Sequence, residues 1–237
     1  MDPVFVWLGG ILFVGSLAFC GFTYLVTWSM PVSAGIRWDA VAIDVALFSV
    51  FALHHSLFAR TRVKQAMSAM VPDHLLRSVY VWIAALLLVM VCAAWRPIGG
   101  EMYRVGGIWQ ALNVIAQLLG VWLIARAVAG IDALELAGIR QVRLPAPSGV
   151  DGKPATTNGL QTGGVYRVVR HPLYLGWVLV VFGAAHMTGD RLIFAAISVL
   201  YLAVAVPWEE RSLVGSFGDE YVRYQQLVRW RMIPFIY

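Results

Sequence analysis

The stretch RHPLYLGWVLVVFGAAHMTGDRLIFAAISVLYLAVAVPWEE, residues 170–210, holds two apolar runs bounded at both ends by ionisable groups. The runs cover 173–187 and 191–207, and only the three residues TGD separate them. So short a connection predicts two consecutive apolar helices that form a tight hairpin. The charged groups would then lie together at the open end of this hairpin.

Arg170 and His171 precede the first run, and Glu209 and Glu210 follow the second. A charge beside hydrocarbon costs roughly 2.5 to 3.5 kcal/mol on insertion scales. Four ionisable groups gathered at such an edge therefore indicate a site for a polar ligand, and a bound ionic cofactor would fit.

The composition of the whole chain indicates a membrane protein. Of its 237 residues 60% are hydrophobic and 13% charged, and the mean hydropathy is +0.73, outside the range of soluble globular domains. A spanning helix needs about 20 apolar residues. Apolar runs of that length or slightly shorter cover 4–28, 39–59, 79–95, 108–130, 173–187 and 191–207.

We therefore expect an all-α polytopic membrane protein with five to six transmembrane helices, the last two forming the tight hairpin. Those two are the shortest, so five full spans and a partial one is an open alternative. The chain is expected to be one membrane domain, 1–237. It would comprise four N-terminal helices within 1–130, a cytoplasmic loop rich in Pro and Gly over 131–170, and the hairpin with its tail over 171–237.

The distribution of Lys and Arg predicts the orientation of the chain. Thirteen of the eighteen basic residues fall in the loops 60–78 and 131–172 and in the tail, on one side of the expected helices. Because positive loops stay in the cytoplasm, both termini and the site should face the cytoplasm, in a bacterial cytoplasmic membrane. The net charge of +5 then suits anionic membrane lipids, and no pattern indicates nucleic-acid binding.

Three motifs in the last seventy residues resemble a known family. They are R-H-P-x-Y-x-G at 170–176, E-E at 209–210 and F-G-x-x-Y-x-x-Y at 217–224. Together they are similar to the integral-membrane methyltransferases typified by isoprenylcysteine carboxyl methyltransferase and the bacterial phospholipid methyltransferases. Upstream, H-S at 55–56, R-P-I-G at 96–99 and G-I-R-Q-V at 138–142 narrow the likeness to the bacterial methanethiol S-methyltransferases.

This resemblance implies that the hairpin and tail bind S-adenosylmethionine, a methyl donor with an ammonium, a carboxylate, a ribose diol and a sulfonium. Carboxylates suit the ammonium and the diol, and cationic donors suit the carboxylate. Pro172 is favourable in the first turn of a helix, whose amide donors would face the same ligand. The expected cofactor-binding residues are Arg170, His171, Tyr174, Gly176, Glu209 and Glu210.

Methyl transfer needs an aligned nucleophile, and a thiol must also lose its proton. His55 and Arg140 are the expected catalytic residues. The first choice of substrate is a small or lipidic thiol, with methanethiol giving dimethyl sulfide. The histidines have no matching carboxylate spacing, so no metal site is predicted.

Other interpretations stay open at this point. The same chemistry could act on an isoprenylcysteine carboxylate or a phospholipid amine, and the R-H-P-x-Y-x-G element also resembles NADPH-dependent sterol reductases. A non-enzymatic scaffold would need none of these roles: Glu209 and Glu210 would begin a solvated helix, and Arg170 would be a positive anchor. Tyr221 and Tyr224 are interpreted as interfacial anchors rather than ligands.

Overall fold

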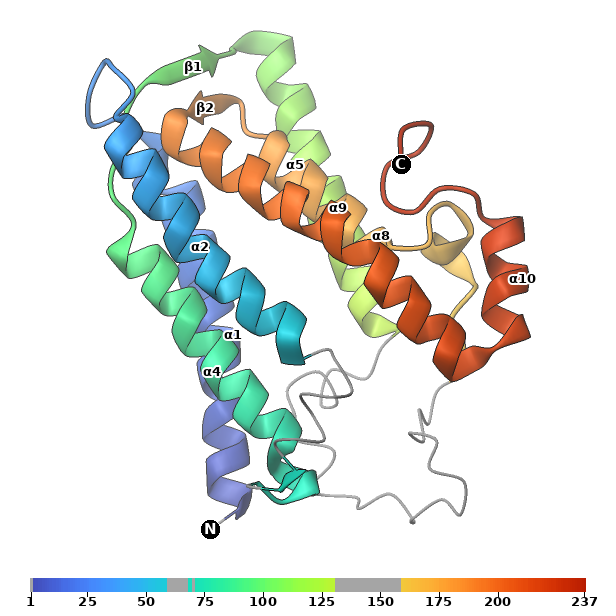
Figure 1. The fold of residues 1–237 in the computed structure, drawn as a ribbon. Coiled ribbons are helices and arrows are strands. Elements are labelled where there is room, and N and C mark those ends of the chain that lie inside the picture. Colours follow the sequence, from blue (N-terminus) through green and yellow to red (C-terminus); the bar gives the residue numbers. More distant parts are fainter. Residues whose placement is uncertain (1, 59–67, 70, 131–158) are drawn as a thin grey trace. The chain divides into compact units, whose positions relative to one another are not determined.

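Every predicted apolar run forms a helix over most of its length in the computed structural model, which describes residues 2–58, 68–69, 71–130 and 159–237 (Figure 1). The run 173–187 is helical only as far as Phe182. These helices are α1 Asp2–Leu25, α2 Trp38–Phe58, α4 Asp73–Ala94, α5 Gly107–Ala129, α8 Pro172–Phe182 and α9 Gly189–Phe217. Among the described residues, all of them except α8 are long and apolar enough to cross a membrane. Helix α8 has 11 residues, which span about 16 Å of the roughly 30 Å of hydrocarbon. The all-α polytopic fold is confirmed, with five long apolar helices and one short one.

Helix α9 continues beyond the apolar run that predicts it. It passes through Pro207 and ends at Phe217, so Glu209 and Glu210 lie within the helix and not after it. A proline inside a helix leaves the carbonyl four residues earlier without its donor. Here that carbonyl belongs to Ala203, and it accepts a hydrogen bond of 2.9 Å from the Tyr237 hydroxyl. The helix therefore tolerates Pro207 because the tail supplies the missing donor.

The remaining elements are short. They are η1 Thr27–Ser29, β1 Glu101–Arg104, η2 Gly164–Arg167, β2 His186–Thr188 and α10 Asp219–Leu227. The chain forms two compact units, the first containing 1–103 and 186–194 and the second 104–132, 159–185 and 195–237 of the residues described. That 1–237 form a single membrane domain stays a prediction.

The first unit is built on the packing of α1 and α2 against α4. Its aromatic core gathers around the buried ring of Phe194, with Trp28 at 5.0 Å and Trp95 at 5.8 Å between ring centroids. The buried carboxylate of Asp190 accepts hydrogen bonds from the Trp95 indole and the Ile98 amide, both at 2.9 Å. Of the three residues predicted to connect the two helices, Thr188 ends β2, Gly189 and Asp190 begin α9, and Asp190 is anchored within this unit.

The second unit is built on the close packing of α8 against α5. A Cβ atom on Gly176 would lie 2.6 Å from the carbonyl oxygen of Gly120, and a Cβ on Gly120 equally close to the carbonyl oxygen of Gly176. Helix α8 also contacts α9 through long side chains, since the Trp177 indole donates to the Ser198 hydroxyl at 3.0 Å. The two glycines bring the helix backbones together and so fix where the start of α8 lies in this unit.

Candidate active site

The start of α8 places two of the predicted site residues. Pro172 is the first residue of the helix, where its missing N–H costs nothing. Just before it, the amides of Arg170 and His171 donate to the carbonyls of Trp230 and Arg231 at 2.9 and 2.8 Å. These backbone bonds tie the tail to the segment that enters α8, and both side chains contact the glutamates of α9.

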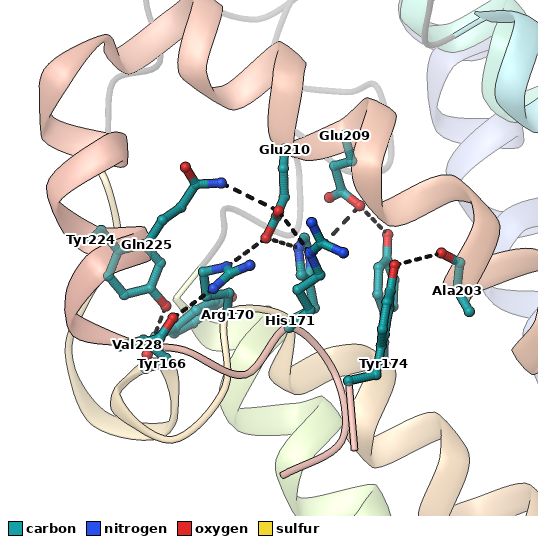
Figure 2. Close-up of polar contacts among 12 residues, drawn as sticks. Tyr166, Arg170, His171, Tyr174, Ala203, Glu209, Glu210, Tyr224, Gln225 and Val228 are labelled. Carbon is teal, nitrogen blue, oxygen red and sulfur yellow. Dashed lines mark hydrogen bonds and ion pairs between the residues drawn. The ribbon is translucent and has the colours of Figure 1, made fainter. Parts of the chain in front are cut away.

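Arg170 and Glu210 form a buried ion pair at the centre of the site (Figure 2). The Nε of Arg170 donates to Oε1 of Glu210 at 2.5 Å, and the side chains are 6% and 5% exposed. The same guanidinium also donates to the carbonyl oxygens of Val228 and Arg229, at 2.6 and 3.0 Å. Arg170 thus joins α8, α9 and the tail through one planar group, as its fork of donors allows.

Glu210 is surrounded by donors on both carboxylate oxygens. Its Oε2 accepts from Nε of Arg231 at 3.2 Å and from Nε2 of Gln225 at 3.3 Å. The Arg231 guanidinium in turn lies 5.2 Å from the centre of the Tyr237 ring. All of these partners are residues of the protein itself. Glu210 therefore links α9 to the segment before α8, to α10 and to the tail.

Glu209 differs from Glu210 because its side chain is 41% exposed. Its Oε2 accepts a hydrogen bond of 2.7 Å from the Tyr174 hydroxyl and lies 3.7 Å from Nδ1 of His171. The His171 ring stacks on the Tyr174 ring at 5.2 Å with an interplanar angle of 3°. Glu209 is thus held in place by two neighbours while part of its carboxylate still faces outward, which suits a ligand-binding role.

His171 lies between the two carboxylates (Figure 2). Its Nε2 is 3.5 Å from Oε1 of Glu210, longer than a normal hydrogen bond, and this nitrogen is buried without a hydrogen-bond partner among the described residues. A buried polar atom in this state is an expected position for a missing ligand or water. His171 therefore has hydrogen-bonding capacity to offer at the site.

Two tyrosines that the sequence assigned to the membrane interface are buried instead. Tyr221 and Tyr224 are 2% and 4% exposed, and the Tyr224 hydroxyl donates to the carbonyl of Tyr166 at 2.7 Å. The anchor interpretation was wrong, because α10 turns back after Gly218 and packs its tyrosine face inward with Val228. Burial raises the pKa of both phenols, which keeps them neutral.

The Tyr221 hydroxyl is buried and lacks a hydrogen-bond partner within the described part of the chain. Sequence reasoning did not assign Tyr221, Gln225 or Arg231 to the site. One signal was present: Tyr221, Tyr224 and Val228 recur at the spacing of one helix face. Nothing local in the sequence pairs Gln225 or Arg231 with Glu210.

The other predicted residues lie outside this cluster. Gly176 is buried against α5, where its missing side chain serves helix packing. His55 belongs to the first unit, where its Nδ1 lies 2.5 Å from the Tyr80 hydroxyl. Arg140 lies outside the described residues. The cofactor-binding role of Gly176 and the catalytic roles of His55 and Arg140 remain predictions.

Comparison with known proteins gives the family. A family model described as phospholipid methyltransferase matches residues 150–220, the part of the chain that carries the ion pair and both glutamates. The chain is 33% identical to the methanethiol S-methyltransferase of Crocosphaera subtropica, covering 100% of this chain and 94% of that protein. It is 35% identical to methanethiol S-methyltransferase 1 of Bradyrhizobium diazoefficiens, covering 81% and 68%.

Nurim of Xenopus laevis is a further relative, 32% identical over 76% of this chain and 64% of that protein. No solved structure matches the chain significantly. The near full-length matches, the five long apolar helices and the buried cluster on α8 and α9 lead to one assignment. The chain belongs to the membrane methyltransferase family of the methanethiol S-methyltransferases.

Proposed function

We propose that this protein transfers a methyl group from S-adenosylmethionine to methanethiol and so forms dimethyl sulfide. The observation that carries this proposal is the contrast between two adjacent glutamates. Glu210 is buried in an ion pair, whereas Glu209 is held in place but half-exposed. The names of the relatives at 33% and 35% identity support methanethiol as the acceptor.

The side chains of the cluster fit an S-adenosylmethionine molecule. Such a ligand needs acceptors for its ammonium or ribose hydroxyls, and the outward-facing carboxylate of Glu209 provides them. The buried Tyr221 hydroxyl and Nε2 of His171 have hydrogen-bonding capacity that no described residue uses. When bound, S-adenosylmethionine supplies a methyl group already activated by its sulfonium. Tyr174 would orient both Glu209 and the His171 ring, through its hydroxyl and its ring face respectively.

The acceptor thiol must be deprotonated, because its thiolate is the reactive form. We propose that the imidazole of His55 accepts this proton, and its ring orientation is fixed by the hydrogen bond between Nδ1 and the Tyr80 hydroxyl. Arg140 is proposed to stabilise the thiolate. The active site and both termini are proposed to face the cytoplasm, as the distribution of basic residues predicts.

The direct test is headspace detection of dimethyl sulfide from purified protein supplied with methanethiol and S-adenosylmethionine. Calorimetric titration of the detergent-solubilised protein with S-adenosylhomocysteine and, separately, with NADPH accompanies it. We expect dimethyl sulfide and binding of S-adenosylhomocysteine alone. Binding of NADPH alone would favour a reductase. Cofactor turnover without dimethyl sulfide would favour a phospholipid amine, the second candidate, which the family match over 150–220 supports.

The role of His55 has its own test. His55→Asn should lower the rate with methanethiol by about 10²–10⁴-fold, the usual contribution of a general base, while S-adenosylhomocysteine affinity stays unchanged. A selenol is more acidic than a thiol and ionised at neutral pH, so methaneselenol should be methylated by the variant with a much smaller loss. The neighbour His54, which stacks on Tyr80 at 5.5 Å, supplies the control His54→Asn. Equal losses with both acceptors would remove His55 as the base.

A further inference from the structure

We propose that the tail of the second unit binds the headgroup of an anionic phospholipid, at a site separate from the Glu209 and Glu210 cluster. A cavity of about 340 Å³, here called the tail pocket, opens between the end of η2 and the segment after α10. Its lining includes Arg167, Val168, Leu227, Arg229, Trp230 and Phe235. None of the residues expected to bind the methyl donor lines it.

Hydrogen bonds join the two chain segments that line the tail pocket. The Arg170 amide donates to the carbonyl of the lining residue Trp230 at 2.9 Å. The Tyr224 hydroxyl donates to the carbonyl of Tyr166, the neighbour of the lining residue Arg167, at 2.7 Å. These bonds join the segment before α8 to α10 and to the chain that follows α10, so both sides of the pocket are held together within this unit.

Positive charge in the tail pocket comes from Arg167 and Arg229. Both residues are exposed, and within the described ranges neither guanidinium forms an ion pair with an acidic side chain. Guanidinium groups bind phosphate oxygens through paired, charge-assisted hydrogen bonds. Two of them on one cavity therefore favour an occupant that carries a phosphate.

Apolar side chains beside these arginines favour a lipid over a free phosphate. Leu227, Phe235 and Ile236 are 83%, 85% and 78% exposed. Phe235 adopts a φ of 66°, a left-handed conformation that is costly for a bulky residue, and its ring lies 5.3 Å from that of Trp230. Apolar groups displayed next to cationic ones are characteristic of segments that lie in the membrane interface.

The length of α9 is consistent with a tail that lies in the membrane interface. Its 29 residues extend about 44 Å, whereas the hydrocarbon of a bilayer is about 30 Å thick. The last turns of α9, and the chain that follows, then reach the layer of lipid headgroups. The excess of basic residues predicts the cytoplasmic leaflet for this end, and that leaflet carries the anionic lipids.

The test measures the thermal midpoint of the full-length protein in an uncharged detergent as lipid is added. We expect phosphatidylglycerol to raise the midpoint by several degrees, and phosphatidylcholine or glycerol 3-phosphate at equal concentration to leave it unchanged. In the double variant Arg167→Gln/Arg229→Gln, the phosphatidylglycerol concentration for half the effect should rise at least fivefold. Arg223→Gln, at an exposed arginine of α10 outside the pocket, is the matched control and should behave as the unsubstituted protein.

Several results would overturn this proposal. Equal effects of phosphatidylglycerol and phosphatidylcholine would mean that no anionic headgroup is recognised, and an equal effect of glycerol 3-phosphate would mean an anion site without lipid. If Arg223→Gln raises the phosphatidylglycerol concentration for half the effect as much as the double variant does, general surface charge and not the tail pocket would explain the effect. Titration with S-adenosylhomocysteine should be unchanged in the double variant, and weaker binding there would assign the pocket to the methyl donor.

Discussion

Glu210→Gln is expected to lower the free energy of unfolding by about 3–5 kcal/mol, because removing one partner of a buried ion pair leaves the other charge uncompensated. That other charge is Arg170, whose guanidinium keeps its carbonyl contacts in the variant but no longer has a negatively charged partner. The measurement is the unfolding midpoint without ligand. Replacing both residues, Arg170→Met with Glu210→Leu, should cost less than the two single changes combined.

The matched control is Glu209→Gln, the same change one residue earlier in the same helix. Its carboxylate is half-exposed and accepts a hydrogen bond from the Tyr174 hydroxyl, so we expect a stability loss below about 1 kcal/mol. Affinity for S-adenosylhomocysteine should instead fall about tenfold or more, since a charge-assisted hydrogen bond contributes roughly 1.5–3 kcal/mol. If Glu210→Gln leaves the unfolding midpoint unchanged, the ion pair with Arg170 does not stabilise the fold. If Glu209→Gln binds S-adenosylhomocysteine with normal affinity, Glu209 does not contact the cofactor.

Gly176→Ala should destabilise the protein by about 1–3 kcal/mol and weaken cofactor binding as well. The new Cβ would lie 2.6 Å from the backbone oxygen of Gly120 and 2.8 Å from the Ile124 side chain. The backbone of Gly120 cannot rotate away from the new Cβ, so α8 must move away from α5. Arg170 and His171 would move with the start of α8. Thermal unfolding and S-adenosylhomocysteine titration would measure the two effects.

Gly215→Ala provides the control, because Gly215 is also a helical glycine of the second unit and a Cβ there meets nothing within 4 Å. Alanine is a better helix former than glycine by about 1 kcal/mol, so this change should be neutral or stabilising. Opposite signs at the two positions are the expected result. Similar behaviour at both would show that the contact between α5 and α8 does not limit stability.

The chain's hydropathy pattern was sufficient to predict the helices and the membrane class. Runs of about 20 apolar residues have few alternatives to a spanning helix, because a bilayer offers no partner for exposed backbone groups. The charged groups at the hairpin ends, together with the family resemblance, led to Arg170, His171, Tyr174, Glu209 and Glu210, all of which lie in one cluster of the second unit. Their roles toward the methyl donor stay proposals.

Other features depend on contacts between residues far apart in the chain. Glu209 and Glu210 are equivalent in the sequence, yet only the second faces Arg170 and Arg231, because helix geometry turns adjacent side chains about 100° apart. The apolar run ends at Pro207, yet the helix continues to Phe217, because the Tyr237 hydroxyl donates to the carbonyl that Pro207 leaves without a donor. The sequence determined which residues are apolar, charged or conformationally restricted. Tertiary structure alone decided which charge is buried and which stays open to a ligand, because burial depends on neighbours that local pattern does not specify.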